Sequence, residues 1–142
     1  MNAQFWIQKL KLEPHPEGGF YKRFYESKES HQCADGRGIR PCMTSIWFLI
    51  PKGIKTKFHK IKSDELWFFH SGNPINLEFL DENNSVKKNT LGHQIEDNQS
   101  LTHVVNAGIW FASEALNGEF DYSLVSCAVA PGFDFQDFTI KP

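Results

Sequence analysis

The residues best suited to chemistry in this chain are a histidine and a nearby glutamate, His59 and Glu65. Alternation along the expected strands places His59 on one face with Ile61, and Glu65 on one face with Trp67. If these faces line a barrel, the two side chains meet in an apolar interior, where burial raises the pKa of a carboxyl and a carboxylate makes a neighbouring histidine more basic. The pair would then serve as acid and base near neutral pH. The alternative is a buried hydrogen bond that only orders the barrel.

Other side chains on the expected strand faces are candidates for binding a ligand. Trp67 shares the face of Glu65, and Thr44 could offer its hydroxyl to the same interior, although threonine is also a common strand residue. Tyr21 and Arg23 share one face of the first expected strand, where an arginine can grip a phosphate or carboxylate through two hydrogen bonds. The alternative for Arg23 is an edge strand whose charge prevents aggregation.

His103 is a further polar candidate, because it has the same parity as Leu101 and Val105 and could face the same interior. With His59 and Glu65 it would make a set of two histidines and one carboxylate. Such sets bind zinc in hydrolytic enzymes and iron in oxygenases. We expect no resident cofactor and keep this divalent-metal set as the alternative.

The remaining polar residues have structural interpretations. His15 has no visible partner and is expected in a surface or turn role, and Glu17 is expected to orient the backbone where the chain enters the barrel. Cys127 lies in an apolar strand and is expected to pack rather than to act as a nucleophile. We expect reduced thiols, with a bridge between Cys33 and Cys42 as the alternative.

The elements that position these residues are a short helix and a series of short strands in one domain, residues 1–142. Apolar residues at helical spacing predict a helix over about 3–11, with Asn2 as its cap and Pro14 beyond its end. From about 18 to 140, aromatic and β-branched runs separated by Pro, Gly and Asn turns predict roughly nine or ten strands, which is typical of an all-β sandwich or barrel. The expected strands are 20–25, 43–50, 55–61, 65–70, 75–80, 86–90, 101–105, 109–114, 121–129 and 133–140, with a polar loop over 28–41.

Composition argues against several classes of function. The formal net charge is −2, and the 13 Phe, 4 Trp and 3 Tyr are interleaved with apolar rather than basic residues, so we expect no nucleic-acid partner. No apolar run is long enough to span a membrane. The first residues lack the apolar block of a signal peptide, and we therefore expect a cytoplasmic protein.

The middle of the chain carries a recognisable spacing. Gly53, His59, Glu65 and Gly72 are separated by five, five and six residues, and a turn at 106–108 (Asn-Ala-Gly) follows further on. This pattern resembles the two signature motifs of the cupin superfamily, whose members are β-barrels of the jelly-roll type. The resemblance implies a ligand site inside the barrel.

In that superfamily three histidines and one glutamate normally hold a divalent metal. His59 takes the first histidine position and Glu65 takes the glutamate position. Ile61 and Phe111 stand at the other two histidine positions, so the resemblance implies the fold and a ligand site bordered by Phe111 rather than the full metal set.

Three longer motifs make a closer resemblance that covers nearly the whole chain. They are Pro-His-Pro-Glu-Gly-Gly-Phe-Tyr at 14–21, Phe-His with Ser-Asp-Glu and Trp within 58–67, and Val-Ala-Pro-Gly-Phe-Asp-Phe at 129–135. Together they resemble one branch of the cupins, whose members are generally dimeric and similar in fold to nucleotide-sugar epimerases. The resemblance implies an RmlC-like jelly-roll β-barrel with a short N-terminal helix, assembled as a homodimer.

These expectations combine in a cupin that binds a small carbohydrate-like or sugar-nucleotide ligand inside the barrel. Isomerase or epimerase chemistry needs a base that takes a proton next to a carbonyl and an acid that returns one on the other face. His59 would be the base and Glu65 its partner. Epimerases of the resembling fold also use a tyrosine acid, for which Tyr21, Tyr25 and Tyr122 are the options. The alternatives are a non-catalytic small-molecule-binding cupin and a metal-dependent cupin oxygenase or hydrolase.

Overall fold

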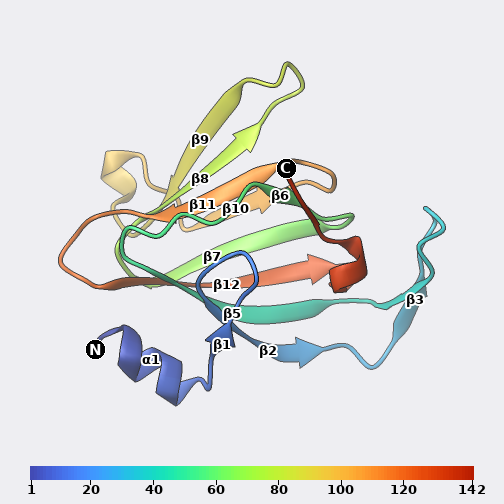
Figure 1. The fold of residues 1–142 in the computed structure, drawn as a ribbon, viewed down its shortest axis with the longest axis horizontal. Helices are drawn as coiled ribbons and strands as arrows, with labels where there is room; N and C mark the ends of the chain where they lie inside the picture. Colours follow the sequence, from blue (N-terminus) through green and yellow to red (C-terminus); the bar gives the residue numbers. More distant parts are fainter.

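The computed structural model describes residues 1–142 as two β-sheets that face each other (Figure 1). The first sheet contains, in spatial order, β1 (Glu13–Pro14), β2 (Phe20–Glu26), β5 (Thr44–Pro51), β12 (Tyr122–Ala130), β7 (Asp64–Gly72) and β10 (Thr102–Val105). The second contains β13 (Thr139–Ile140), β6 (His59–Lys60), β11 (Phe111–Ala115), β8 (Ile75–Leu80) and β9 (Val86–Leu91). Neighbouring strands within each sheet are antiparallel. The predicted all-β jelly-roll architecture is confirmed.

The main hydrophobic core fills one half of the space between the sheets. Strand alternation points Ile50 of β5 and Phe69 of β7 inward, where they meet Ile75 and Leu77 of β8. Burying side chains of this size stabilises the fold by roughly 1.5–3 kcal/mol each. The opposite half, where β5 and β7 begin and β12 ends, is less completely filled and holds the site described below.

A short helix, α1 (Ala3–Lys9), covers part of the outer face of the first sheet (Figure 1). The side chain of Asn2 accepts a hydrogen bond from the N–H of Phe5 at 2.9 Å and caps the helix, as predicted. The helix ends earlier than the predicted residue 11, because the chain turns at Lys11, which has a left-handed φ of +55°. That turn directs Leu12 into a second apolar cluster beneath the helix.

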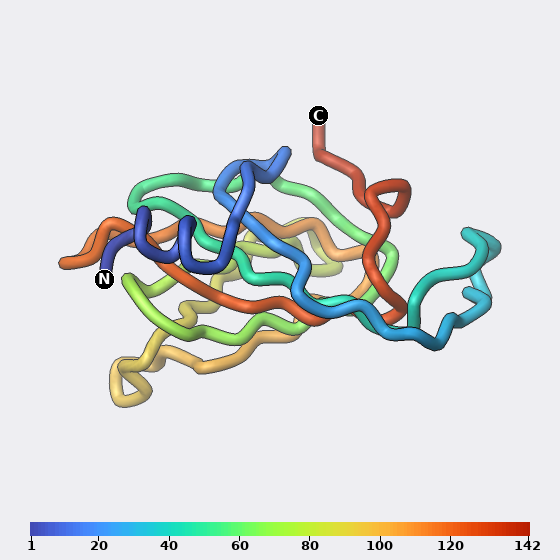
Figure 2. Tube along the Cα trace, turned by 90° about the horizontal axis from the view of Figure 1, so that it is seen from below, coloured from blue at the N-terminus to red at the C-terminus, as the bar shows by residue number.

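Residues 28–41, predicted as a polar loop, contain a small hairpin formed by β3 (Ser30–Gln32) and β4 (Ile39–Pro41). Figure 2 shows this hairpin standing away from the rest of the chain. Within it the backbone N–H of Cys33 donates to the carbonyl oxygen of Gly38, whereas the backbone N–H of Cys42 donates to the carbonyl oxygen of Glu29 at the other end of the hairpin. The two thiols are therefore separated along the hairpin, and all three cysteines are free.

Two predicted strands are shorter than expected. In the 55–61 segment only His59–Lys60 form a strand, because the chain crosses beside β11 and touches it first at an isolated bridge between Lys55 and Glu114. In the 133–140 segment a 3-10 helix, Phe135–Asp137, precedes β13, and the side chain of Asp134 caps that helix. None of the helices has the length and apolarity needed to cross a bilayer.

Candidate functional site

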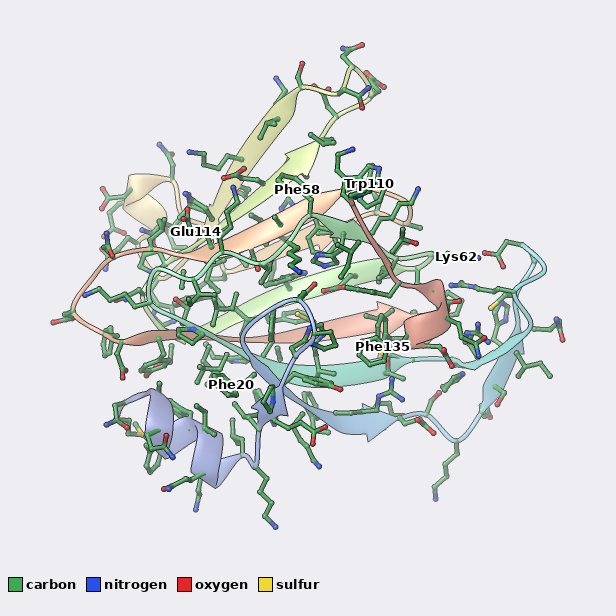
Figure 3. All side chains as sticks on the ribbon, in the orientation of Figure 1. Phe20, Phe58, Lys62, Trp110, Glu114 and Phe135 are labelled. Carbon is green, nitrogen blue, oxygen red and sulfur yellow. The ribbon has the colours of Figure 1, made fainter.

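A cavity of about 430 Å³ lies between the sheets in the half that the main core leaves open. Its floor is formed by inward-facing residues of β5, β7 and β12. Its rim is formed by the loop over residues 13–17 and by the C-terminal segment 133–138. Figure 3 labels Phe135 on this segment, beside the end of β12. Segments from both ends of the chain therefore border one cavity.

The N-terminal loop reaches the cavity through a tight turn. The N–H of His15 donates to the carbonyl oxygen of Gly19 at 2.9 Å, and the N–H of Gly18 donates back to that of His15 at 3.0 Å. Gly19 has φ +80°, and a Cβ there would lie 2.7 Å from the carbonyl oxygen of Leu49. Only glycine combines that conformation with so close an approach to β5. The turn holds His15 and Glu17 over the cavity, with 8% and 5% of their side chains exposed.

His59 of β6 is held in the cavity wall and paired with a carboxylate. Its ring stacks on Phe138, with centroids 5.3 Å apart, and is tilted against Phe111 at 4.2 Å. Its Nδ1 lies 2.7 Å from the carbonyl oxygen of Lys57 and 2.9 Å from Oε2 of Glu17. Burial opposes protonation of the ring, but the hydrogen bond and negative charge of Glu17 outweigh it, and the pKa of His59 is raised.

Glu65 of β7 stands apart from this pair. The acid–base pair was expected between His59 and Glu65, but the carboxylate in contact with His59 is that of Glu17, because the N-terminal loop brings Glu17 closer. Burial on the cavity floor raises the pKa of the Glu65 carboxyl to about 7, against the opposing charge of His59. Burial also raises the pKa of the Cys127 thiol beside it, so this thiol stays protonated and is a poor nucleophile.

His15 belongs to the cavity rather than to the surface, contrary to the sequence-based expectation. Its Nδ1 accepts a hydrogen bond from the backbone N–H of Glu17 at 3.1 Å. Its ring packs edge-on against Tyr21, with centroids 4.7 Å apart, and lies near Phe48 at 5.4 Å. Burial lowers the pKa of His15. The signal that could have revealed this residue is the pair of glycines after Glu17, which marks a tight turn into the barrel.

Four predicted ligand-binding residues line the cavity. They are Tyr21, Arg23, Thr44 and Trp67. Arg23 is anchored by hydrogen bonds of 2.8 Å to the carbonyl oxygen of Phe133 and to Glu26. The Thr44 hydroxyl accepts a hydrogen bond from the N–H of Phe133 at 2.9 Å, so it helps to fix the C-terminal segment. Nε1 of Trp67 is buried without a hydrogen-bond partner.

Two other predicted residues do not line the cavity. His103 lies against Phe79, and its Nδ1 is 2.9 Å from the side-chain nitrogen of Asn89. It occupies the edge strand β10 at the far side of the first sheet, so the set of His59, Glu65 and His103 is not assembled. Phe111 packs behind the ring of His59 and supports it from the core.

Two facing antiparallel sheets with a cavity between them, lined by polar side chains, define a jelly-roll protein of the cupin class. The family model described as Cupin superfamily (DUF985) matches residues 4–141. The chain belongs to this family, so the sequence-based assignment to the cupin superfamily is confirmed.

Comparison with known proteins agrees with this assignment. The chain is similar to a hypothetical protein from Leishmania major, with 34% identity, a TM-score of 0.91, and coverage of 99% of this chain and 88% of that one. It is similar to protein SO0799 from Shewanella oneidensis, with 33% identity, a TM-score of 0.87, and coverage of 99% and 85%. The uncharacterized protein YML079W of Saccharomyces cerevisiae is 29% identical over 97% of this chain and 74% of its own length. Oxalate decarboxylase from Bacillus subtilis, at 12% identity and a TM-score of 0.64 over 89% of this chain and 29% of its own, shares the fold.

The residues present do not fit the four-ligand metal set of the cupin motifs. Ile61 is an apolar residue in the cavity wall, and Phe111 packs its ring against His59. Neither side chain can donate an electron pair to a metal. No group of three or more His, Cys, Asp or Glu side chains is arranged to hold an ion.

Proposed function

We propose that the cavity binds a small carbohydrate-like or sugar-nucleotide ligand and that His59 acts as a base in isomerase or epimerase chemistry on it. The observation that carries this proposal is the pair formed by His59 and Glu17 inside the cavity. A histidine held by a carboxylate is oriented for proton transfer, and the carboxylate stabilises the imidazolium that forms when the base takes a proton. Glu17 thus takes the orienting role that the sequence-based hypothesis gave to Glu65.

Glu65 is suited to the opposite task in the same reaction. A carboxyl whose pKa is about 7 carries a proton in a large fraction of molecules at neutral pH. It can return a proton to the substrate after His59 has removed one. Among the tyrosines, Tyr21 lines the cavity, whereas Tyr25 is exposed on β2 and the hydroxyl of Tyr122 shares a hydrogen bond with the hydroxyl of Ser71. Its place in the cavity lining supports Tyr21, rather than the other two tyrosines, as an assisting acid.

The lining of the cavity favours a sugar-like ligand with an anionic group. Phe133, Phe135 and Tyr21 offer aromatic faces that pack against the apolar side of a ring. Arg23 brings a positive charge to the lining, which suits a phosphate or carboxylate. The free indole N–H of Trp67 offers a donor on the floor for a ring oxygen or hydroxyl.

The second candidate function is a binding protein without turnover. It is favoured by the neutral character of the cavity floor, where Trp67, Cys127 and a protonated Glu65 offer donors to a ligand without a nucleophile. Recognition alone needs an apolar pocket with a few well-placed polar groups. The two candidates differ in whether a carbon-bound proton of the ligand exchanges with solvent.

The test is proton exchange in D2O with a panel of aldose and ketose phosphates and of keto nucleotide sugars, each of which carries a carbonyl group with a C–H bond beside it. Loss of the proton signal next to a carbonyl, followed by NMR, is expected for at least one compound with the wild-type protein. His59→Gln is expected to slow the exchange by about 10²- to 10⁴-fold, the usual contribution of a general base. His103→Gln is the matched control, because it changes a histidine outside the cavity. Thermal stabilisation by a compound that never exchanges would instead support the binding protein.

The partner implied by the resemblance to dimeric cupins is a second copy of the chain. The part of the outer face of the first sheet that α1 leaves uncovered supports this proposal, because it exposes Phe24, Leu66 and Val104, with 49%, 37% and 52% of their surface accessible. Leu66 and Val104 lie side by side on β7 and β10. Light scattering is expected to give the mass of a dimer for the wild type and of a monomer for Leu66→Asp. A monomeric wild type would contradict the proposal.

A further inference from the structure

Two histidines line the same cavity and are held by hydrogen bonds of opposite kind. His15 comes from the N-terminal loop, and His59 comes from β6 in the second sheet. Both rings lie near Phe138, with centroids 6.3 Å and 5.3 Å from it, and both Nδ1 atoms approach Glu17. Neither Nε2 atom has a hydrogen-bond partner in the protein. The Nε2 atoms are therefore the groups that each ring can offer to a ligand.

The tautomer of His15 is fixed by the backbone. Its Nδ1 accepts the N–H of Glu17, so the lone pair of Nδ1 is occupied and this atom carries no proton. The neutral ring must then carry its proton on Nε2. Burial lowers the pKa of His15, which keeps the ring neutral. His15 thus presents an uncharged N–H donor.

The tautomer of His59 is fixed in the opposite sense. Its Nδ1 faces two acceptors, the carbonyl oxygen of Lys57 at 2.7 Å and Oε2 of Glu17 at 2.9 Å. An atom surrounded by acceptors must be the donor, so Nδ1 carries the proton. In the neutral ring Nε2 then has a free lone pair. His59 thus presents an acceptor of protons.

We propose that His15 is a second catalytic residue, whose Nε2–H donates a hydrogen bond to the carbonyl oxygen of the ligand while Nε2 of His59 removes the proton from the adjacent carbon. This inference rests on the proposed function and names a further group in it. The C–H bond breaks, its electron pair forms a carbon–carbon double bond, and the carbonyl π electrons move to the oxygen held by His15. His59 becomes an imidazolium beside Glu17. Glu65 then gives a proton back to carbon, and the carbonyl is restored without any oxidant or reductant.

The arrangement implies a particular class of substrate. The compound must carry a carbonyl group with a C–H bond beside it, so that oxygen and hydrogen can face two different histidines at once. A neutral imidazole is a suitable donor for an oxygen that becomes negative only during the reaction, because it stabilises the developing charge without protonating the ground state. Keto sugars and aldoses meet this requirement, whereas glycosides without a carbonyl do not.

The first test reads the tautomers directly, without any ligand. Imidazole nitrogens with and without a proton have well-separated ¹⁵N shifts, and the two residues are assigned with His15→Gln and His59→Gln. In wild-type protein at slightly alkaline pH, His15 is expected to be neutral with its proton on Nε2, and His59 to carry a proton on Nδ1. A proton on Nδ1 of His15, a charged His15 at that pH, or the same neutral tautomer in both rings would overturn the inference.

The second test measures exchange in D2O with the panel of carbonyl-bearing sugar phosphates and nucleotide sugars described above. His15→Leu removes the donor and is expected to reduce kcat by about 10²- to 10³-fold, as loss of an oxyanion donor does, with KM changed only a few-fold. His15→Gln keeps a neutral N–H at a similar reach and is expected to restore at least part of that loss. His103→Leu makes the same change outside the cavity and should leave the rate unaltered. Circular dichroism shows whether each variant folds.

The outcomes separate this inference from the proposed function. If a compound exchanges and both His15 variants exchange it as fast as wild type, the role of His15 is wrong and the role of His59 stands. If no compound of the panel exchanges with wild-type protein, the proposed function fails and the catalytic role of His15 fails with it. If His15→Gln is as slow as His15→Leu and both fold, donation from Nε2 is contradicted.

Discussion

Replacing Glu65 by glutamine removes one ionisable group from the cavity and keeps a side chain of nearly the same shape. In the folded protein, burial raises the pKa of this carboxyl from 4.5 to about 7. Between these values the folded state still binds a proton that the unfolded chain has released. The stability contributed by Glu65 is therefore fully present below about pH 4.5 and is lost as the pH rises through about 7.

The size of this effect follows from the shift itself. The rise from 4.5 to about 7, at 1.36 kcal/mol for each pKa unit, corresponds to about 3 kcal/mol of unfolding free energy. Glutamine does not ionise, so the unfolding free energy of the variant does not fall with pH for this reason. The difference in unfolding free energy between Glu65→Gln and the wild type is thus expected to grow in favour of the variant by about 3 kcal/mol across this range, and to level off above it.

The assay is urea denaturation of both proteins at a series of pH values. Taking the difference at each pH cancels the titration of groups that behave alike in the two proteins, and any constant effect of the substitution appears as an offset. Glu82→Gln is the control, because this carboxyl is exposed in the turn between β8 and β9, and its difference should stay within about 0.5 kcal/mol. The reasoning is refuted if the difference in unfolding free energy between Glu65→Gln and the wild type stays constant with pH, or if it shifts in favour of the wild type as the pH rises.

Three other perturbations test neighbouring parts of the structure. Arg40 donates two hydrogen bonds of 2.9 Å to the buried carboxylate of Asp137, so Arg40→Ala is expected to lower the unfolding free energy by about 3–5 kcal/mol in urea denaturation, and a change below about 1 kcal/mol would contradict the pair. Gly19→Ala forces a side chain into φ +80° and against the backbone of β5, so calorimetry should show a loss of about 2 kcal/mol or more. The pKa of His59 is raised and a base must be unprotonated, so the rate of solvent exchange of the ligand proton should rise with pH, with an apparent pKa above 6.5. Glu17→Gln should lower that apparent pKa. An unchanged apparent pKa would exclude the pairing of His59 with Glu17.

The strands could be predicted from the sequence because their information is local. Residues 44–51 and 64–72 alternate or run apolar over one strand length, and the turns between strands carry Pro, Gly or Asn. The helix was predicted for the same reason, since Asn2 and the apolar spacing after it lie within one short segment. Two predicted boundaries were wrong, the end of the helix and the length of the strand expected over 55–61. The helix ends at Lys9 and the strand contains only His59–Lys60, because tertiary contacts set these boundaries.

The partner of His59 could not be predicted in the same way. Glu17 and His59 lie on separate elements, and only the assembled barrel brings them to 2.9 Å. Strand parity placed His59 and Glu65 in one interior, as the structure shows, but parity does not say which carboxylate comes closest. His103 was expected in the cavity from the same kind of parity. It lies on an edge strand, where a side chain on the inner face of the sheet does not reach the cavity.

The distribution of polar groups in this protein is easier to understand if the two halves of the sandwich have different tasks. Four titratable side chains, His15, Glu17, His59 and Glu65, occupy one half, where apolar residues would be more stable. The other half is packed with aliphatic and aromatic side chains, and α1 buries a further cluster on the outside. Proteins break the rules of core formation mainly where function requires it. Stability supplied by the packed half and the helix thus permits the cavity to keep the buried charge that the proposed role in binding or catalysis requires.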